Sequence, residues 1–220
     1  MNQGTLPILS LLLAAAAQGQ GQKSTVYRES FDGVKPGRLP EGWRVDATNP
    51  GGDLAAWSVV ADPKSQTPPN VLSLEAVRDK SGSVFNLCWT RNVLFADGSL
   101  EVKVRADSGK EDQGGWVIWR AADAKNYYIA RYNPLESNFR IYSVKDGRRR
   151  QIASVEDLAV KAGEWFTVKI VHKGKRIEGW LNDKKRIGAD DETFSAAGGV
   201  GLWTKADAAS SFDDFAVTVD

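Results

Sequence analysis

Three consecutive segments in the middle of the chain constrain the fold most. They are 114–120, 126–133 and 138–144, and aromatic and β-branched residues, which favour strands, dominate each of them. The connecting pieces, 121–125 and 134–137, contain the Asp, Pro and Ser residues that favour turns. The pattern predicts three antiparallel strands in a meander, with one face toward a core and the other free.

The rest of the chain repeats this pattern of short strands and frequent turns. Apolar and charged residues alternate over 100–104, which predicts a strand with one polar face. Hairpin turns are expected at Asp146-Gly147, Lys173-Gly174 and Asn182-Asp183. No segment of ten or more residues has a convincing helical period, so we expect one all-β domain over 25–220, a two-sheet antiparallel jelly-roll sandwich.

The N-terminus has the composition of a targeting segment. The first 22 residues carry no charged side chain, and an apolar block at 6–17 ends in small residues. We expect a secretory signal peptide at 1–17, a disordered leader at 18–24, and a secreted or periplasmic mature chain. The alternative is an uncleaved anchor, but the block is shorter than the ~20 residues that a membrane span needs.

Charge and cysteine content disfavour several classes of function. The formal net charge of +1 gives no basic field of the kind that binds nucleic acid, so we do not expect that partner. Cys88 is the single cysteine, so an intrachain disulfide and a thiolate metal cluster are excluded. Its simplest role is that of a small buried apolar residue.

Arginines interrupt the apolar runs of the meander. Arg120, Arg131 and Arg140 lie within predicted strands, where a buried guanidinium without a partner would be costly. Because side chains alternate with a period of two, Tyr127 and Asn133 share one side of their strand with Arg131. We expect this side to be the wetter face.

Two interpretations of these residues stay open. In one, they line a concave surface that binds sugar, because guanidinium forks and amides match hydroxyl and carboxylate groups. In the other, Glu101 and Asp123 neutralise the arginines in an internal ion-pair lattice that binds nothing. Trp203 precedes the polar segment 204–207, and it is therefore the tryptophan that we expect to expose a ring for sugar stacking, while most of the others fill the core.

Three aspartates are candidates for a structural calcium site. Asp32 follows the first predicted strand, and Asp213 and Asp214 lie on the last one; terminal strands often pair in jelly rolls, and carboxylate oxygens suit Ca²⁺. The alternative is that they cap turns and accept hydrogen bonds from backbone amides. No cofactor is required by any motif.

The single histidine, His172, is chemically suited to acid–base catalysis. It lies beside the predicted turn at Lys173-Gly174, and no motif ties a carboxylate or nucleophile to it. We therefore expect an exposed turn histidine.

Several of these segments together resemble a known group of proteins. They are the glycine-rich start at 114–115, Trp119-Arg120, Asn126-Tyr127-Tyr128, Asn138 to Tyr142, Gly163-Glu164-Trp165, 199–207 and Phe212-Asp213-Asp214. The chain resembles the concanavalin A-like, laminin-G-like jelly-roll proteins over 31–219 and is close to the 3-keto-disaccharide hydrolase domain family of exported bacterial proteins. The resemblance implies two packed sheets, of which the concave one usually faces the ligand.

The resemblance leaves function open, because one superfold hosts many activities. Laminarinase-like glycoside hydrolases of this fold carry Glu-x-Asp-x-Glu on one strand, whereas 101–105 here has one carboxylate and two cations. We therefore expect a lectin-like module that binds a glycan. The alternatives are an adhesion or scaffold module, and a hydrolase or lyase acting on modified glycosides such as 3-keto-disaccharides, for which the acid–base candidates are Glu101, Asp123, His172 and Asp207.

Overall fold

The computed structural model describes Met1, 25–75 and 82–220. Met1 apart, the predicted signal peptide at 1–17 and leader at 18–24 lie outside the described residues. Strands and turns, with no helix, make up the described part of the chain, so none of its segments is a helix that could cross a membrane.

The strands form two antiparallel sheets. The eight-stranded sheet has the order β13-β12-β11-β6-β15-β4-β3, with β1 also pairing with β15. Its strands are β1 (Thr25–Glu29), β3 (Trp57–Ala61), β4 (Asn70–Leu74), β6 (Gly98–Ser108), β11 (Trp165–Lys173), β12 (Arg176–Leu181), β13 (Lys184–Asp190) and β15 (Ala209–Val219). The seven-stranded sheet has the order β10-β9-β8-β7-β14-β5-β2. Its strands are β2 (Trp43–Thr48), β5 (Phe85–Phe95), β7 (Trp116–Asp123), β8 (Asn126–Asn133), β9 (Asn138–Lys145), β10 (Arg148–Val155) and β14 (Gly198–Lys205).

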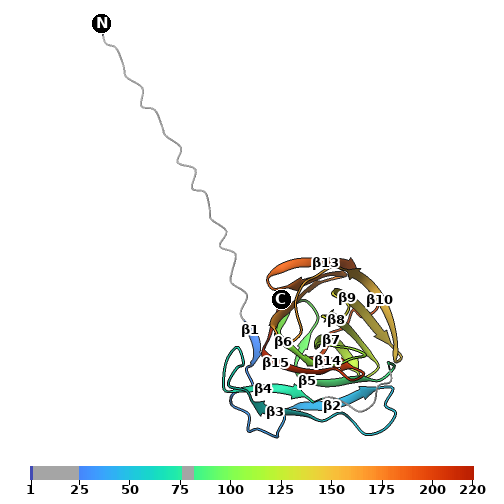
Figure 1. The fold of residues 1–220 in the computed structure, drawn as a ribbon. Helices are drawn as coiled ribbons and strands as arrows, with labels where there is room; N and C mark the ends of the chain where they lie inside the picture. Colours follow the sequence, from blue (N-terminus) through green and yellow to red (C-terminus); the bar gives the residue numbers. More distant parts are fainter. Residues whose placement is uncertain (2–24, 76–81) are drawn as a thin grey trace.

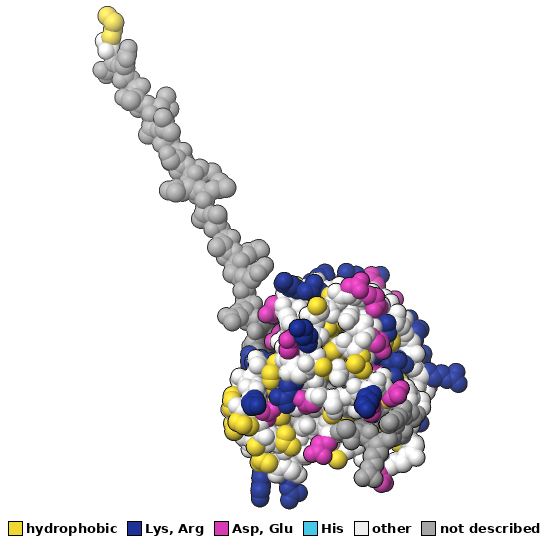
Figure 2. Space-filling model, in the orientation of Figure 1, with side chains coloured by type: hydrophobic (Ala, Val, Ile, Leu, Met, Phe, Trp, Pro, Cys, Tyr) yellow, Lys and Arg dark blue, Asp and Glu magenta, His cyan; other side chains and the backbone are white. Residues whose placement is uncertain are grey.

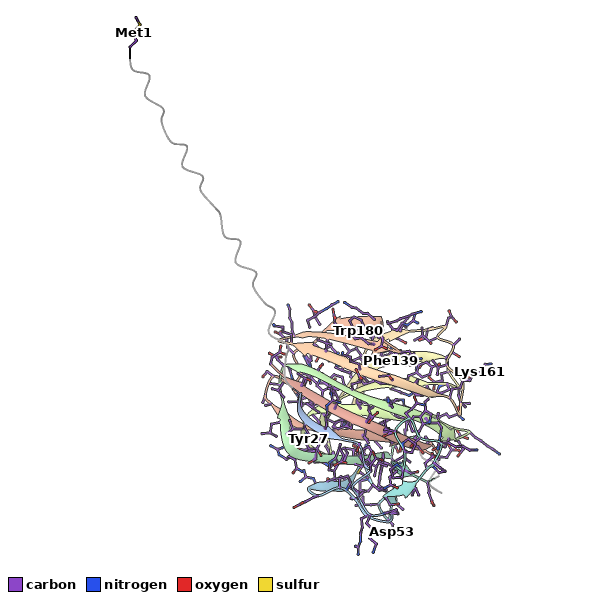
Figure 3. All side chains as sticks on the ribbon, turned by 90° about the vertical axis from the view of Figure 1, so that its left-hand side faces the viewer. Met1, Tyr27, Asp53, Phe139, Lys161 and Trp180 are labelled. Carbon is purple, nitrogen blue, oxygen red and sulfur yellow. The ribbon has the colours of Figure 1, made fainter. Side chains whose placement is uncertain are left out.

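The two sheets lie face to face over one large apolar core (Figure 1). Leu100, Val102 and Val104 of β6 face this core, as the alternation in that segment predicted. Phe139 of β9 also lies inside the body, whereas Asp53 is on an exposed loop (Figure 3). The predicted jelly-roll sandwich is confirmed.

Local sequence signals place most of the strands and turns. The predicted meander is β7, β8 and β9, paired in antiparallel order. Asn182 and Asp183 both have positive φ, 48° and 59°, which is the conformation that a tight two-residue hairpin between β12 and β13 requires. The first and last strands pair as expected, with Glu29 opposite Phe215.

The central strands of the seven-stranded sheet, β7, β8, β9 and β14, are buried on both faces, which the alternation did not predict. Its second face holds a separate apolar cluster, which we call the curled face: Phe85, Leu87, Trp89, Trp116, Ile118, Ala121, Tyr127, Ile129, Tyr142, Val144 and Trp203. The predicted wetter side of β8 is this face, and Tyr127, Arg131 and Asn133 are each at most 2% exposed. That expectation was wrong.

The burial follows from the curvature of the sheet. Five strand spacings separate β10 from β5, about 24 Å in a flat sheet. Nevertheless, the guanidinium carbon of Arg149, on β10, lies 5.4 Å from the centre of the Phe85 ring on β5. At one end, Asn49 after β2 donates a hydrogen bond to the Gly147 carbonyl beside β10, so the two edges of the sheet meet. The sheet therefore curls over its own aromatic side chains.

Candidate functional site

Arg131 belongs to a sealed ion-pair network on the curled face. Its side chain is 2% exposed and donates to Asp112 at 2.8 Å and to Glu136 at 3.0 and 3.2 Å, and its guanidinium carbon lies 5.1 Å from the centre of the Trp116 ring. Asp112, 1% exposed, also accepts hydrogen bonds from Asn133 at 2.7 Å and Lys205 at 3.0 Å. The Arg131 guanidinium itself is closed off from solvent, and the geometry around it is that of the internal lattice.

Arg140 extends this network toward solvent. It pairs with Glu136 at 2.9 Å and with Glu156 at 3.4 Å, and its side chain is 26% exposed. Burial alone would raise the pKa of Glu136, but hydrogen bonds from Arg131 and Asn138 and the charges of both arginines lower it to about 2. Glu136 is therefore an anion at every physiological pH and a poor proton acceptor.

Arg120 connects three loops at one end of the sandwich through its hydrogen bonds. Its guanidinium donates to the carbonyls of Ala96, Phe194 and Gly174 and pairs with Asp97 at 3.1 Å. It is 3% exposed, and its backbone has a positive φ of 47° where the pairing of β7 with β8 is irregular. All three guanidinium nitrogens donate hydrogen bonds within the protein, so the expectation of a free ligand-binding guanidinium is corrected.

The two aromatic candidates are also buried. Tyr127 and Trp203 are both 0% exposed, and the Trp203 indole donates to the Tyr127 hydroxyl at 2.9 Å. Burial raises the pKa of the Tyr127 hydroxyl despite its hydrogen bonds with Thr48 and Trp203. The expectation of an exposed Trp203 ring was wrong because the curled sheet covers the strand end that carries it.

The acid–base candidates are separated from one another. Glu101 lies on the outer face of the eight-stranded sheet, 3.7 Å from Lys169, so it cannot neutralise the arginines of the other sheet. Asp123 accepts hydrogen bonds from the Lys125 backbone amide and the Asn126 side chain, which makes it a turn cap. The expected lattice partners of the arginines were therefore wrong, although the lattice exists.

Asp207 is a loop-capping residue. Its carboxylate accepts hydrogen bonds from the backbone amides of Lys110, Glu111 and Asp112 at 2.9 to 3.2 Å. Slight burial raises the pKa of Asp207, but these amides outweigh it and hold the pKa below its usual value. Asp207 thereby fixes the loop that places the Asp112 carboxylate beside Arg131.

His172 is a core residue, contrary to the expectation of an exposed turn. Strand β11 continues through Lys173, so alternation places His172 on the same side as Phe166, Val168 and Ile170. Its Nδ1 accepts a hydrogen bond from the Trp119 indole at 2.8 Å. Burial, with the nearby Arg120 charge, lowers the pKa of His172 to about 4. A neutral, enclosed imidazole cannot reach a substrate.

The aspartates proposed for calcium are held by protein donors. Asp213 accepts hydrogen bonds from the Thr67 amide and hydroxyl, Asp32 accepts one from the Asn70 amide, and Asp214 pairs with Lys103. Across the described residues, no three His, Cys, Asp or Glu side chains are grouped to hold a metal ion. Calcium binding stays a prediction without a site among these residues. Cys88, as expected, is buried.

Sequence reasoning missed the carboxylates that partner the arginines. Asp97, Asp112 and Glu136 all lie in turns or loops, outside the segments with alternating side chains. Glu136 offered one signal, because it lies in the turn of the hairpin that carries Arg131 and Arg140. For Asp112 and Asp97, no local pattern indicates which strand they approach.

Two open clefts lie side by side at one end of the sandwich. A cleft of about 810 Å³ is lined by Ser143, Lys145, Asp146, Arg148, Arg150, Glu192 and Thr193. A second cleft of about 260 Å³ is lined by Ala96, Asp97, Arg120, Gly174, Lys175, Glu192, Phe194 and Ser195. Glu192 lines both, so we call the pair the end groove.

The loop at 191–195 forms the centre of the end groove. Arg150 pairs with Asp191 at 2.5 Å and donates to Thr193 at 3.0 Å, which holds this loop against β10. The ring of Phe194 is partly exposed and packs edge-on against Tyr128. The Tyr128 hydroxyl in turn donates to Asp191 at 2.7 Å. Burial and the nearby Asp191 carboxylate raise the pKa of Tyr128 to about 12, so this donor stays protonated.

The face seen in Figure 2 has basic and acidic side chains interspersed. The end groove shares this mixed character, with lysine and arginine beside aspartate and glutamate. It can therefore donate and accept hydrogen bonds along its length.

Solved structures of low sequence identity share the fold. The carbohydrate binding module CBM66 from Bacillus subtilis is 21% identical, with a TM-score of 0.61, and the match covers 79% of this chain and 93% of that one. A galectin-like protein of unknown function from Bacillus subtilis is 13% identical, with a TM-score of 0.62, over 90% and 97% of the chains. A Bacillus licheniformis beta-glucanase is 12% identical, with a TM-score of 0.59, over 90% and 100%.

No curated protein matches the sequence significantly. The sequence profile of one family, the 3-keto-alpha-glucoside-1,2-lyase-like domain, matches residues 27–218. This range includes both sheets almost completely. The chain belongs to the 3-keto-alpha-glucoside-1,2-lyase-like domain family.

Proposed function

We propose that this chain is a carbohydrate-recognition module that binds its ligand noncovalently in the end groove. The observation that carries the proposal is that two neighbouring clefts share Glu192 and combine polar groups with a partly exposed ring, Phe194. Sugar would then bind at the end of the sandwich and not in the middle of the meander, where Arg120 and Arg131 are buried.

The chemistry of the end groove suits a sugar. Hydroxyl groups both donate and accept hydrogen bonds, and the groove offers carboxylate acceptors as well as guanidinium and ammonium donors. The Phe194 ring suits the apolar C–H face of a pyranose. The larger cleft, about 810 Å³, is within the range of ordinary small-ligand sites.

The family and the shared fold support the same ligand class. The family description refers to a glucoside, and two of the solved structures of this fold are a carbohydrate binding module and a beta-glucanase. Fold similarity alone does not transfer function, so the end groove provides the specific argument.

Binding is favoured over catalysis by the state of the acidic groups. Glycoside chemistry uses two carboxyl groups that face each other across the bond to be broken. Glu101, Asp123 and Asp207 lie on different parts of the molecule and are engaged by lysine or by backbone amides.

The test is glycan-array binding followed by titration calorimetry with the best ligand. Phe194→Ala and Arg148→Ala should each weaken binding at least about tenfold, since each removes a ring or a donor from the groove. Arg38→Ala is the matched control, because Arg38 is exposed beside β3. This strand is at one edge of the eight-stranded sheet, and β13, which leads into the 191–195 loop, is at the other edge. Unchanged affinity in both groove variants, with the fold intact by circular dichroism, would refute the proposal.

The family description favours a second candidate, a lyase or hydrolase acting on a 3-keto-glycoside. Glu192 is the exposed carboxylate common to both clefts and would be the proton acceptor. Turnover of a 3-keto-glycoside by the purified chain, lost in Glu192→Gln and kept in Glu101→Gln, would establish this activity. Absence of turnover over a panel of 3-keto-glycosides would eliminate it.

A further inference from the structure

Arg149 is a cation without a carboxylate partner on the curled face. The other cations of this face are paired: Arg44 with Asp46, Arg131 with Asp112 and Glu136, Arg140 with Glu136 and Glu156, and Lys205 with Asp112. Among the described residues, no carboxylate pairs with Arg149, which is instead held near the rings of Tyr142 and Phe85, at 4.5 and 5.4 Å.

The two rings leave the hydrogen-bonding capacity of Arg149 unused. A ring attracts the cation through its π electrons, but it is at best a weak acceptor for the N–H groups. The Nη1 atom of Arg149 is buried and has no hydrogen-bond partner. Burial lowers the pKa of Arg149, and the positive charge of Arg131 acts in the same direction. The positive charge of Arg149 is therefore only partly compensated by the surrounding protein, which offers it two rings but no carboxylate and no hydrogen-bond acceptor for Nη1.

A second unsatisfied donor lies on the same face. Only 2% of Arg131 is exposed, and its Nε atom has no hydrogen-bond partner. Arg131, Asp112 and Glu136 are all close enough to influence the charge of Arg149. Because Asp112 and Glu136 are already neutralised by Arg131, Arg140 and Lys205, they offer Arg149 no free acceptor.

This region has a side that faces solvent. Glu136 has 41% of its side chain exposed, Arg140 has 26% and Lys205 has 17%. Arg149 itself is partly exposed and comes from β10, the edge strand of its sheet. A ligand group would therefore meet the exposed part of the Arg149 side chain from this side, whereas the opposite end is closed by the contact between Asn49 and Gly147.

We propose that Arg149 is the centre of a second binding site, distinct from the end groove, that takes the carboxylate of an acidic saccharide. The carboxylate would supply the acceptor oxygens that Arg149 lacks, in the paired geometry that guanidinium and carboxylate share. The polar rim formed by Glu136, Arg140 and Lys205 would contact the hydroxyl groups of the sugar.

Arg38 provides the control, because it is exposed beside β3 and lies in neither proposed site. Arg148 and Arg149 are adjacent in β10 and point to opposite faces, so Arg148 lines the end groove while Arg149 lies on the curled face. The probes are trigalacturonate, the neutral galactotriose, and sodium sulfate as a free anion, each titrated by calorimetry at low ionic strength against the folded full chain and its variants.

We expect the chain to bind trigalacturonate, Arg149→Ala to weaken this binding at least about tenfold, and Arg38→Ala to leave it unchanged. Arg149→Lys should recover only part of the affinity, because an ammonium group cannot make the paired contact. Galactotriose binding should be insensitive to Arg149→Ala. Because Arg149 has no ionic partner to lose, the variant should also keep the far-ultraviolet circular dichroism of the folded chain.

Three results would overturn the proposal: no binding of trigalacturonate, equal loss of that binding in Arg38→Ala and Arg149→Ala, or an Arg149-dependent site that takes sulfate and not trigalacturonate. The experiment also separates this site from the end groove. If the end-groove proposal were wrong, the binding of neutral sugars would be insensitive to Arg148→Ala and Phe194→Ala, whatever the result with Arg149→Ala.

Discussion

Removing the charge of Asp112 should destabilise the fold more than any ordinary polar substitution. In Asp112→Asn the shape is kept, but Arg131, which is 2% exposed, loses its buried anion, and Lys205 loses its partner. Breaking a buried pair on one side typically costs about 3–5 kcal/mol. This is a large fraction of the roughly 5–15 kcal/mol by which domains of ordinary size are stable.

The comparison is with a surface pair of the same fold. Glu101 and Lys169 are 3.7 Å apart with side chains 40% and 38% exposed, so Glu101→Gln should cost no more than about 1 kcal/mol. The double variant Asp112→Asn, Arg131→Met should lose less than the sum of the two single variants, because it leaves no uncompensated buried cation at Arg131.

The assay is urea unfolding at neutral pH, followed by tryptophan fluorescence, with the free energy of unfolding compared among the four variants and the parent chain. A loss in Asp112→Asn no larger than in Glu101→Gln would refute the reasoning, since it would mean that Arg131 is accessible to water. Additive losses in the double variant would show that the two side chains are not coupled.

Three further predictions concern stability. His172 has a pKa of about 4 in the folded chain, below the ordinary value of 6.5, because burial disfavours the imidazolium, so the unfolded chain binds the proton first. The free energy of unfolding should therefore fall by about 3 kcal/mol in total as the pH drops from 6.5 toward 4. In His172→Gln, urea unfolding should show no such dependence of stability on pH between pH 6.5 and 5. An unchanged dependence in this variant would mean that other groups cause it. In Gly115→Ala, the added Cβ would lie 2.2 Å from Cζ of the buried Phe212 ring, so we expect a loss of about 1–3 kcal/mol by thermal unfolding, and a neutral result would contradict the packing described. In Asp207→Ala, the amides of 110–112 lose their acceptor, so hydrogen exchange at these three residues should accelerate while exchange in β11 does not; uniform protection would contradict the capping role.

The strands and turns could be predicted because their signals are local. Alternation over 100–104 and the turn pair Asn182-Asp183 act on neighbouring residues, and the structure places β6 and the hairpin between β12 and β13 where these signals indicate. The orientation of His172 was mispredicted because the turn signal beside it concealed that β11 continues through Lys173.

The accessible surface could not be predicted because it depends on the curvature of a whole sheet. A period of two shows that Tyr127, Arg131 and Asn133 share a face, but not whether that face meets water. The contact of Arg149 with Phe85 across five strand spacings has no counterpart in local sequence. For the same reason the end groove, built from the segments around Lys145, Gly174 and Glu192, was not anticipated.

The most direct test of the proposed function is a nuclear magnetic resonance titration of the ¹⁵N-labelled chain with the neutral oligosaccharide that binds best in the array. Amide shifts should concentrate at Glu192, Thr193 and Phe194 and in the turns at Lys145 and Gly174, with Tyr127 and Arg131 unchanged. Shifts centred on Tyr127 and Arg131, with the 191–195 loop unaffected, would contradict the assignment of sugar binding to the end groove.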